Sequence, residues 1–342
     1  MIHGLLSGRL GTALHLGTIY PRFSKNTKSF YKTISVTVVM TLIISVVMSL
    51  ISLIFGTVFW GAKVTDFLDI VFVVIATMAL GLTLSIVTIK VAFVTFKRGL
   101  DPDIVVYPIM STTADIFITI CYIIILNAFF VFDFVGKSVI AVIILVHLLL
   151  VLYMIPKNFR EQDFRKNLKE SLYTMLFVSI IVNVTGTVLK SIGTVVENRK
   201  GTIITVFPAL IDMVGDVGSV VGSTATTKLA LGLLRPSLSS IRHHAKTILS
   251  AWAASIVMFF VLAVLAPALN GTFSLSSFSN LISILLIANV IAVSAIILLS
   301  FGISILTFQK GLDPDNFVIP IESSFADSLM SIALLVALVL VG

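Results

Sequence analysis

The chain consists largely of apolar stretches without charged residues, and each stretch is about as long as a lipid bilayer is thick. Of its 342 residues, 58% are apolar and 11% are charged, whereas soluble globular proteins average roughly 45–50% and 25%. A water-soluble core of this size could not enclose so much apolar surface. The composition therefore excludes a soluble fold and predicts a multi-pass membrane protein.

The apolar stretches are continuous rather than alternating, which predicts helical spans and not a barrel. We therefore expect an all-α, polytopic helical membrane protein with nine spans, at residues 33–57, 68–96, 104–132, 137–155, 168–193, 203–233, 246–268, 280–307 and 316–341. The segment from Gly4 to Gly17 is apolar but too short to cross the bilayer.

The basic residues predict the sidedness of the chain. Three basic segments, at 22–32, 157–166 and 235–246, fall on one side of the expected topology, which predicts that this side is the cytoplasm. The C-terminal Gly342 then lies on the outer side. The loop around Val196 is one of the loops expected on that side. These loops explain the net charge of +7, so we expect membrane lipid as a partner and no nucleic acid.

An internal repeat relates the two ends of the chain. Residues 97–103, Lys-Arg-Gly-Leu-Asp-Pro-Asp, recur at 309–315 as Gln-Lys-Gly-Leu-Asp-Pro-Asp, a shift of 212 positions. Residues 7–17 align in the same way with 222–232, and each of these segments precedes a proline and a basic loop. The chain thus predicts two halves with the same order of parts.

These repeats predict the domain organisation. We expect a first repeat at 1–132 that is incomplete at its start, a linker helix and connector at 133–167, and a second repeat at 168–342. The extra linker span gives both repeats the same orientation, so they form a pseudo-dimer about an axis along the membrane normal. The first repeat lacks about one and a half helices, which predicts that Met1 is an internal or truncated start.

Ionisable residues inside spans are costly, so each is a functional candidate. In each half, one aspartate lies one helical turn after two hydroxyl residues, on the same helix face. The two sets are Ser111, Thr112 and Asp115, and Ser323, Ser324 and Asp327. Oxygen donors with negative charge suit a hard divalent cation. Hydrogen-bonded aspartates with a purely structural role are the alternative.

Three further acids lie in the spans of the second half. Glu322 precedes Asp327 by five residues and has Met110 as its counterpart, so it adds charge to one half only. Asp212 and Asp216 lie one turn apart in a glycine-rich span, which predicts close packing, a break or a pore lining. A small-residue helix interface is the alternative for these two.

The Gly-Leu-Asp-Pro-Asp motif has two interpretations. Gly99 can end one helix, and Asp101 can cap the next, with Pro102 in its first turn. The other interpretation gives Asp103 and Asp315 a direct role in a cytoplasmic cation vestibule. His15, His147, His243 and His244 show no spacing typical of zinc sites, and we expect the His243–His244 pair to be solvated.

The repeated motif resembles a known family. The Gly-Leu-Asp-Pro-Asp sequence, the proline, hydroxyl pair and aspartate that follow it, and the segment 208–232 are similar to the membrane domain of MgtE magnesium channels and MgtE-like solute carriers. The resemblance implies two five-helix units around a two-fold pore, with Asp115 and Asp327 at its magnesium site. It also implies that Asp216 replaces an asparagine usual in the family.

We therefore expect transport of a divalent cation, Mg²⁺ first, through a pseudo-two-fold pore lined by aspartates. Divalent cations are then the partners, Mg²⁺ is cargo, and neither an organic cofactor nor an enzymatic activity is expected. The alternatives are a cation-coupled Mg²⁺ exchanger, a carrier for Mn²⁺ or Co²⁺, a structural scaffold, and a membrane-embedded, metal-dependent lipid headgroup transferase using Asp101 and Asp103.

Overall fold

The computed structural model describes residues 2–61 and 63–341, with the side chains of Trp60, Asp133 and residues 187–201 outside the description. Every regular element in this part of the chain is helical. The chain divides into two compact units, Met1–Asn183 with Asp315–Pro320, and Val184–Pro314 with Ile321–Gly342.

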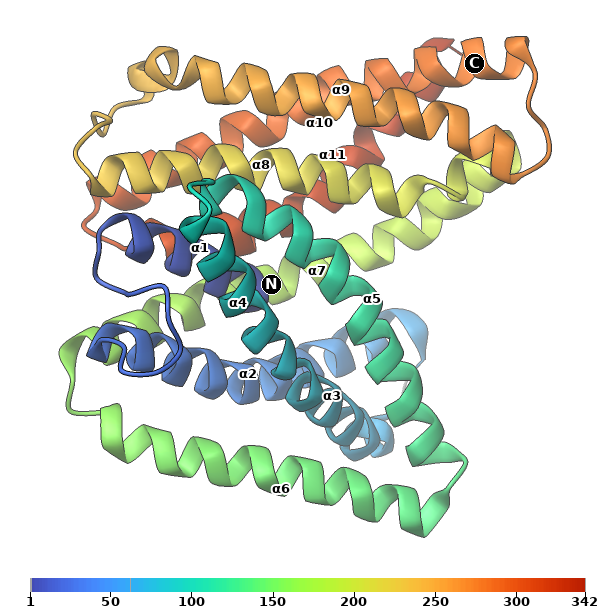
Figure 1. The fold of residues 1–342 in the computed structure, drawn as a ribbon. Helices are drawn as coiled ribbons and strands as arrows, with labels where there is room; N and C mark the ends of the chain where they lie inside the picture. The colour runs from blue at the N-terminus through green and yellow to red at the C-terminus, as the bar shows by residue number, and fades with distance from the viewer. Residues whose placement is uncertain (1, 62, 342) are drawn as a thin grey trace. The chain divides into compact units, whose positions relative to one another are not determined.

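The first unit contains six complete helices and the start of a seventh (Figure 1). They are α1 (Ile2–His15), α2 (Lys28–Phe55), α3 (Phe67–Gly81), α4 (Thr83–Lys97), α5 (Pro102–Phe130), α6 (Asp133–Asn158) and the first part of α7 (Gln162–Ile204). A π-helical turn, Gly56–Trp60, and a 3₁₀ turn, Val64–Asp66, join α2 to α3.

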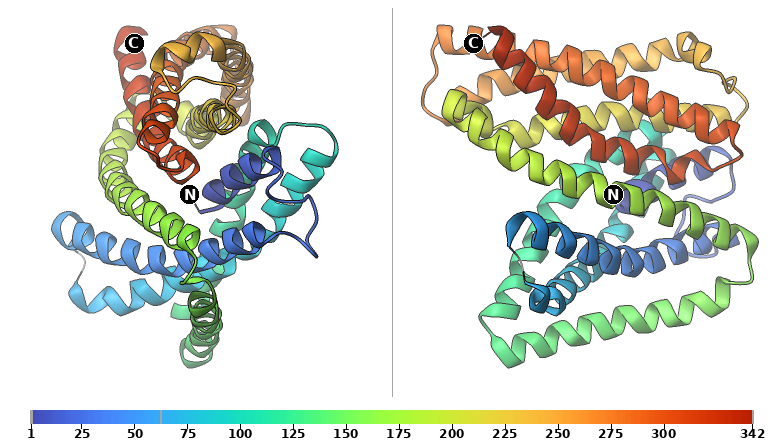
Figure 2. Two further views of the ribbon diagram at one scale, coloured as in Figure 1. Left: turned by 90° about the vertical axis from the view of Figure 1, so that its left-hand side faces the viewer. Right: turned by 180° about the vertical axis from the view of Figure 1, so that it is seen from behind.

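The second unit is a bundle of long helices packed side by side (Figures 1 and 2). It contains α8 (Phe207–Ala230), α9 (Ile241–Leu269), α10 (Leu275–Gln309) and most of α11 (Val318–Val341). The 3₁₀ turns Leu238–Ser240 and Pro314–Asn316 precede α9 and α11. One continuous apolar core joins these helices, and Phe259, Met330 and Phe301 are among its buried side chains.

Eight helical segments of the described chain are long and apolar enough to cross a membrane. They coincide with eight of the nine expected spans, which confirms a multi-pass membrane protein. The ninth expected span, 203–233, falls on α8, which is long enough but not among these eight. Every residue of α8 from 214 to 227 is buried, so neighbouring helices, rather than lipid, surround this more polar helix.

Three sequence expectations need correction. The span expected at 168–193 is part of α7, which runs from Gln162 to Ile204 and through the loop expected near Val196. The span expected at 68–96 is broken at Leu82 into α3 and α4. His244 is fully buried, not solvated, and its Nε2 lies 3.1 Å from the Thr224 hydroxyl of α8.

The repeat predicted from the sequence recurs as repeated backbone conformation. Gly99 and Gly311 end α4 and α10 with φ of 73° and 69°, a left-handed conformation that glycine adopts without steric cost. Leu100 N–H donates to the Thr95 carbonyl at 3.1 Å, and the equivalent bond from Leu312 to Thr307 is 3.0 Å long. Each half therefore ends this helix by the same device.

A second pair of helix ends repeats in the same way. Gly17 and Gly232 have φ of 67° and 70° after α1 and α8. This matches the sequence alignment of 7–17 with 222–232, so α1 corresponds to the last part of α8.

A buried arginine holds α1 within the first unit. The Arg9 guanidinium donates to the Asn316 amide oxygen and to the Ser171 hydroxyl, the latter at 3.1 Å. Asn316 in turn donates to Glu170 Oε2 at 2.8 Å. A charge with few hydrogen bonds would be costly in this position, so the network fixes how α1 packs against α7.

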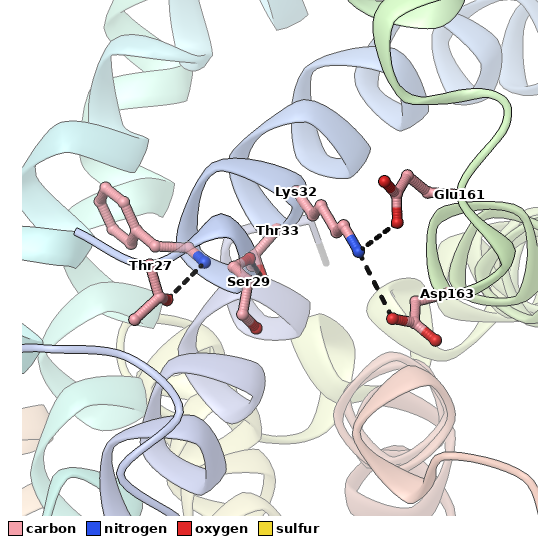
Figure 3. Close-up of polar contacts among 7 residues, drawn as sticks. Thr27, Ser29, Lys32, Thr33, Glu161 and Asp163 are labelled. Atoms are coloured by element: carbon pink, nitrogen blue, oxygen red, sulfur yellow. Dashed lines mark hydrogen bonds and ion pairs between the residues drawn. The ribbon is translucent and has the colours of Figure 1, made fainter. Parts of the chain in front are cut away.

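Further polar contacts of this unit, a helix cap and an ion pair, lie at the start of α2. Thr27 caps the helix by accepting a hydrogen bond from Phe30 N–H at 3.3 Å, and Lys32 pairs with Glu161 at 2.8 Å and with Asp163 at 3.5 Å (Figure 3). The pair places the start of α2 and the α6–α7 connection at the same end of the first unit, as the expected topology requires.

Candidate functional site

Four acidic residues of the second unit lie on α8 and α11. Asp212 and Asp216 lie on α8, and Glu322 and Asp327 lie on α11. The two helices pack against each other, since a β-carbon on Gly218 would lie 2.5 Å from Glu322 Oε2 and one on Gly215 would lie 3.7 Å from Ala326 Cβ. The four carboxyl groups therefore lie on two helices in direct contact within a single helical bundle.

Glu322 is the most enclosed member of this cluster. Its side chain is 0% exposed, and among the described residues neither of its carboxyl oxygens has a hydrogen-bond partner. Asp216 is 6% exposed, while Asp212 and Asp327 are half-buried. Burying a carboxylate without partners is unfavourable unless a cation or proton compensates it.

The glycines of α8 explain how Glu322 reaches this position. A β-carbon on Gly218 would lie 2.5 Å from Glu322 Oε2, 2.7 Å from Ile296 Cγ1 and 3.0 Å from Ser300 Oγ. The absence of a side chain at Gly218 thus makes room for the carboxyl group between α8 and α10. Of the three possibilities expected for this glycine-rich segment, the continuous helix favours close packing.

Serine hydroxyl groups accompany the acids, and one of them, that of Ser300, was not predicted from the sequence. Ser324 is buried and Ser323 half-buried on α11. Ser300 of α10 is 0% exposed and its Oγ also has no hydrogen-bond partner among the described residues. Nothing in the sequence pattern could single out Ser300, because only the packing of α10 against α8 places it, like Glu322, beside Gly218.

The first unit arranges its predicted site residues differently. Asp115 is exposed on α5, in contrast to Asp327. The hydroxyls of Ser111 and Thr112 donate to the Pro108 carbonyl, at 3.1 and 3.5 Å. These side chains still share one face of α5, and each hydroxyl oxygen keeps acceptor capacity.

The second aspartate of each copy of the motif, Asp103 and Asp315, is buried and lies against α1. Asp103 is 4% and Asp315 is 5% exposed. A β-carbon on Gly11 would collide with Asp103 Oδ1, and one on Gly8 would lie 3.5 Å from Asp315 Oδ1. The predicted cap is confirmed in the first half, where the Asp101 carboxylate accepts a hydrogen bond from Asp103 N–H at 2.9 Å. In the second half a 3₁₀ turn comes before α11 instead.

The chain is a multi-pass helical membrane protein with ionisable groups buried among its spans, and such groups mark ion or substrate pathways, proton relays or ligand counter-ions. The family of MgtE divalent cation transporters matches residues 2–125 and 207–338, which is more than half of the chain. The chain therefore belongs to the MgtE divalent cation transporter family, and divalent cations are the substrates that this membership implies.

The two matched regions also confirm the internal duplication. The interval between them, 126–206, contains α6. Comparison with curated proteins and with solved structures gives no match.

Proposed function

We propose that the protein carries Mg²⁺ across the membrane along a pathway lined by aspartates of both halves. In the second half Asp327 is the central donor, supported by Asp216, Asp212, Glu322, Ser323 and Ser324. In the first half Asp115 is the central donor, with Ser111 and Thr112. Asp103 and Asp315 lie at the cytoplasmic entrance in this proposal.

The observation that carries the proposal is the buried carboxyl group of Glu322 among three other acids. Negative charge concentrated in a low-dielectric environment is compensated by a passing cation, and a divalent ion compensates it most strongly. Oxygen donors without nitrogen or sulfur favour Mg²⁺, Ca²⁺ or Mn²⁺ over softer metals.

The proposal includes how the ion is held. Mg²⁺ loses its waters reluctantly, so the carboxylates contact its hydration shell and leave the shell largely intact. With the basic loops in the cytoplasm and the C-terminus outside, an inside-negative potential favours inward movement of two charges by about 4.6 kcal/mol per 100 mV.

The proposed domain division supports a pseudo-two-fold pathway. Repeats at 1–132 and 168–342, joined by a linker at 133–167, each contribute one central aspartate. Their acids are unequal, because Glu322 has Met110 as its counterpart. This inequality favours, as a second candidate, a cation-coupled exchanger or a carrier of Mn²⁺ or Co²⁺ with non-equivalent sites.

Ion flux into liposomes tests the proposal. Wild-type protein should take up Mg²⁺, and Asp327→Asn should slow uptake by about ten- to a hundredfold, since a hydrogen bond to a charged group contributes about 1.5–3 kcal/mol. Asp69→Asn removes an exposed carboxylate of α3 and should leave uptake unchanged. Equal rates in wild type and Asp327→Asn would refute the proposal, and parallel assays with Mn²⁺ and Ca²⁺ rank the ions.

A further inference from the structure

A histidine and two aspartates, far apart in the sequence, meet in the first unit. His15 ends α1, while Asp101 and Asp103 begin α5. One ligand atom from each of the three lies within 4.8 Å of the other two, and His15 Nε2 is 3.6 Å from Asp101 Oδ1. We propose that these three residues bind a first-row transition-metal ion such as Zn²⁺ or Co²⁺, at a site that does not include Asp115 or Asp327 and that shares Asp103 with the proposed cytoplasmic entrance.

The imidazole of His15 is oriented for such a role. Its Nδ1 lies 3.3 Å from the Gly11 carbonyl oxygen, and its ring packs edge-on against Phe96 of α4 with centroids 5.9 Å apart. Donation from Nδ1 to a backbone carbonyl fixes the tautomer and leaves the Nε2 lone pair toward the carboxylates. Histidines that bind metals are held in the same manner.

The carboxylates are also held in place before a metal arrives. Asp101 is fixed by accepting the hydrogen bond from Asp103 N–H at 2.9 Å. Asp103 is 4% exposed and lies in a space that a side chain at position 11 would fill. Two carboxylates and one imidazole thus converge from two helices, with one ligand atom of each within 4.8 Å of the others.

The donor set selects the kind of ion. One nitrogen and two carboxylate oxygens suit Zn²⁺, Co²⁺ and related ions, whereas Mg²⁺ prefers oxygen donors alone. The position aligned with His15 in the second half is Ala230, so this donor set belongs to one half only. A bound ion would tie the end of α1 to the start of α5.

Metal binding to the full-length protein in detergent tests the inference, with Co²⁺ as a coloured probe and Zn²⁺ as its competitor. In a large excess of Mg²⁺, wild-type protein should bind one Co²⁺ with a visible ligand-field spectrum, and Zn²⁺ should displace it. His15→Ala should weaken binding by at least about tenfold, the lower end of what loss of a supporting group costs. Asp101→Asn should also weaken binding, because the variant loses the carboxylate charge. Asparagine remains a good helix cap, so the start of α5 is kept.

Two matched controls address non-specific binding. His243→Ala removes an exposed histidine of the α8–α9 region, and Asp313→Asn changes the residue equivalent to Asp101 in the second half. Both should bind Co²⁺ as wild type does. Zn²⁺ should also raise the melting temperature of wild type but not of His15→Ala. If His15→Ala does not fold, His15→Gln takes its place.

Three results would each overturn the inference. They are no Co²⁺ binding by wild type, unchanged affinity in the folded His15 variant, and displacement of Co²⁺ by an equal concentration of Mg²⁺. The first two would leave His15 and Asp101 as an ion pair only. These outcomes are distinguishable from a failure of the proposed transport, because Asp103, Asp115 and Asp327 are untouched in every variant.

Discussion

Gly218 of α8 lies directly against the carboxyl group of Glu322 in α11, so closely that a β-carbon on the glycine would be 2.5 Å from Oε2. The acid therefore occupies a space that only glycine leaves open. This relationship ties the small-residue character of α8 to the presence of a carboxyl group inside the second unit. Substitution of Gly218 should therefore change the packing, whereas substitution of Glu322 should change the number of acidic groups.

Gly218→Ala should destabilise the protein by about 1–3 kcal/mol, the usual cost of overfilling a packed core. The added methyl group would press on both Glu322 and Ile296. Gly215 is the matched control, because a β-carbon there lies 3.7 Å from Ala326, an ordinary contact distance. Gly215→Ala should be neutral or stabilising by up to about 1 kcal/mol. Thermal unfolding in detergent compares the two, and equal stabilities would contradict this account of the packing.

Glu322→Met should make the protein more stable and a poorer transporter. Methionine is the residue at the corresponding position 110, and it replaces a buried carboxyl group that lacks hydrogen-bond partners among the described residues. Removing such a group should add about 1–3 kcal/mol of stability, while one acid is lost from the cluster. The measurements are unfolding and Mg²⁺ uptake on the same preparation. Lower stability with unchanged uptake would assign Glu322 a structural role.

The capping residue Asp101 and the central aspartates Asp115 and Asp327 should respond differently to substitution. Asp115→Asn and Asp327→Asn should strongly reduce divalent-cation uptake with little change in stability. Asp101→Ala should instead lower stability by about 0.5–2 kcal/mol through the lost cap, whereas Asp101→Asn retains it. Uptake and unfolding of the four variants distinguish these effects. Mild and equal effects on uptake would indicate that all three aspartates are structural.

The ion pair between Lys32 and Glu161 should make stability depend on acid pH. Lys32 lowers the pKa of Glu161 below its ordinary value of 4.5 by a hydrogen bond and by its charge. A lowered carboxyl pKa stabilises the folded state above the ordinary value, and the contribution disappears as pH falls through the folded value. Glu161→Gln should therefore be less stable than wild type at neutral pH and equal to it well below pH 4.5.

The control for the ion pair is Asp163→Asn, whose partner distance is longer, 3.5 Å against 2.8 Å. It should have a smaller effect than Glu161→Gln. The effect of Glu161→Gln should also shrink at high salt, because exposed pairs are screened. A difference from wild type that does not change between neutral and acid pH would mean that Lys32 does not hold Glu161 ionised.

The sequence predicts the helices because hydrophobic length alone determines most of them. The span expected at 203–233 falls on a helix, α8, although its acids, glycines and hydroxyl residues make it less apolar than a lipid-facing span. The prediction fails at α7, where the polar stretch before Thr202 suggests a loop although the helix continues to Ile204. Helix continuity depends on backbone hydrogen bonds rather than polarity.

The candidate site could be predicted only in part for a related reason. Asp327, Asp216 and Glu322 stand out because acids are costly inside spans. Ser300 and His15 do not, since a serine in an apolar helix and a lone histidine carry no spacing signal. Ser300 and Glu322 both lie against Gly218, and His15 lies against Asp101, only through packing between distant parts of the chain.

The central claim is that Asp115 and Asp327 hold the transported cation, and locating the ion tests it most directly. Crystals of the wild type and of Asp327→Asn grown with Mn²⁺ would reveal the ion by anomalous scattering. The account predicts Mn²⁺ within the reach of these carboxylates, directly or through one water, and its loss in Asp327→Asn. Mn²⁺ found only elsewhere, or unchanged in the variant, would contradict it.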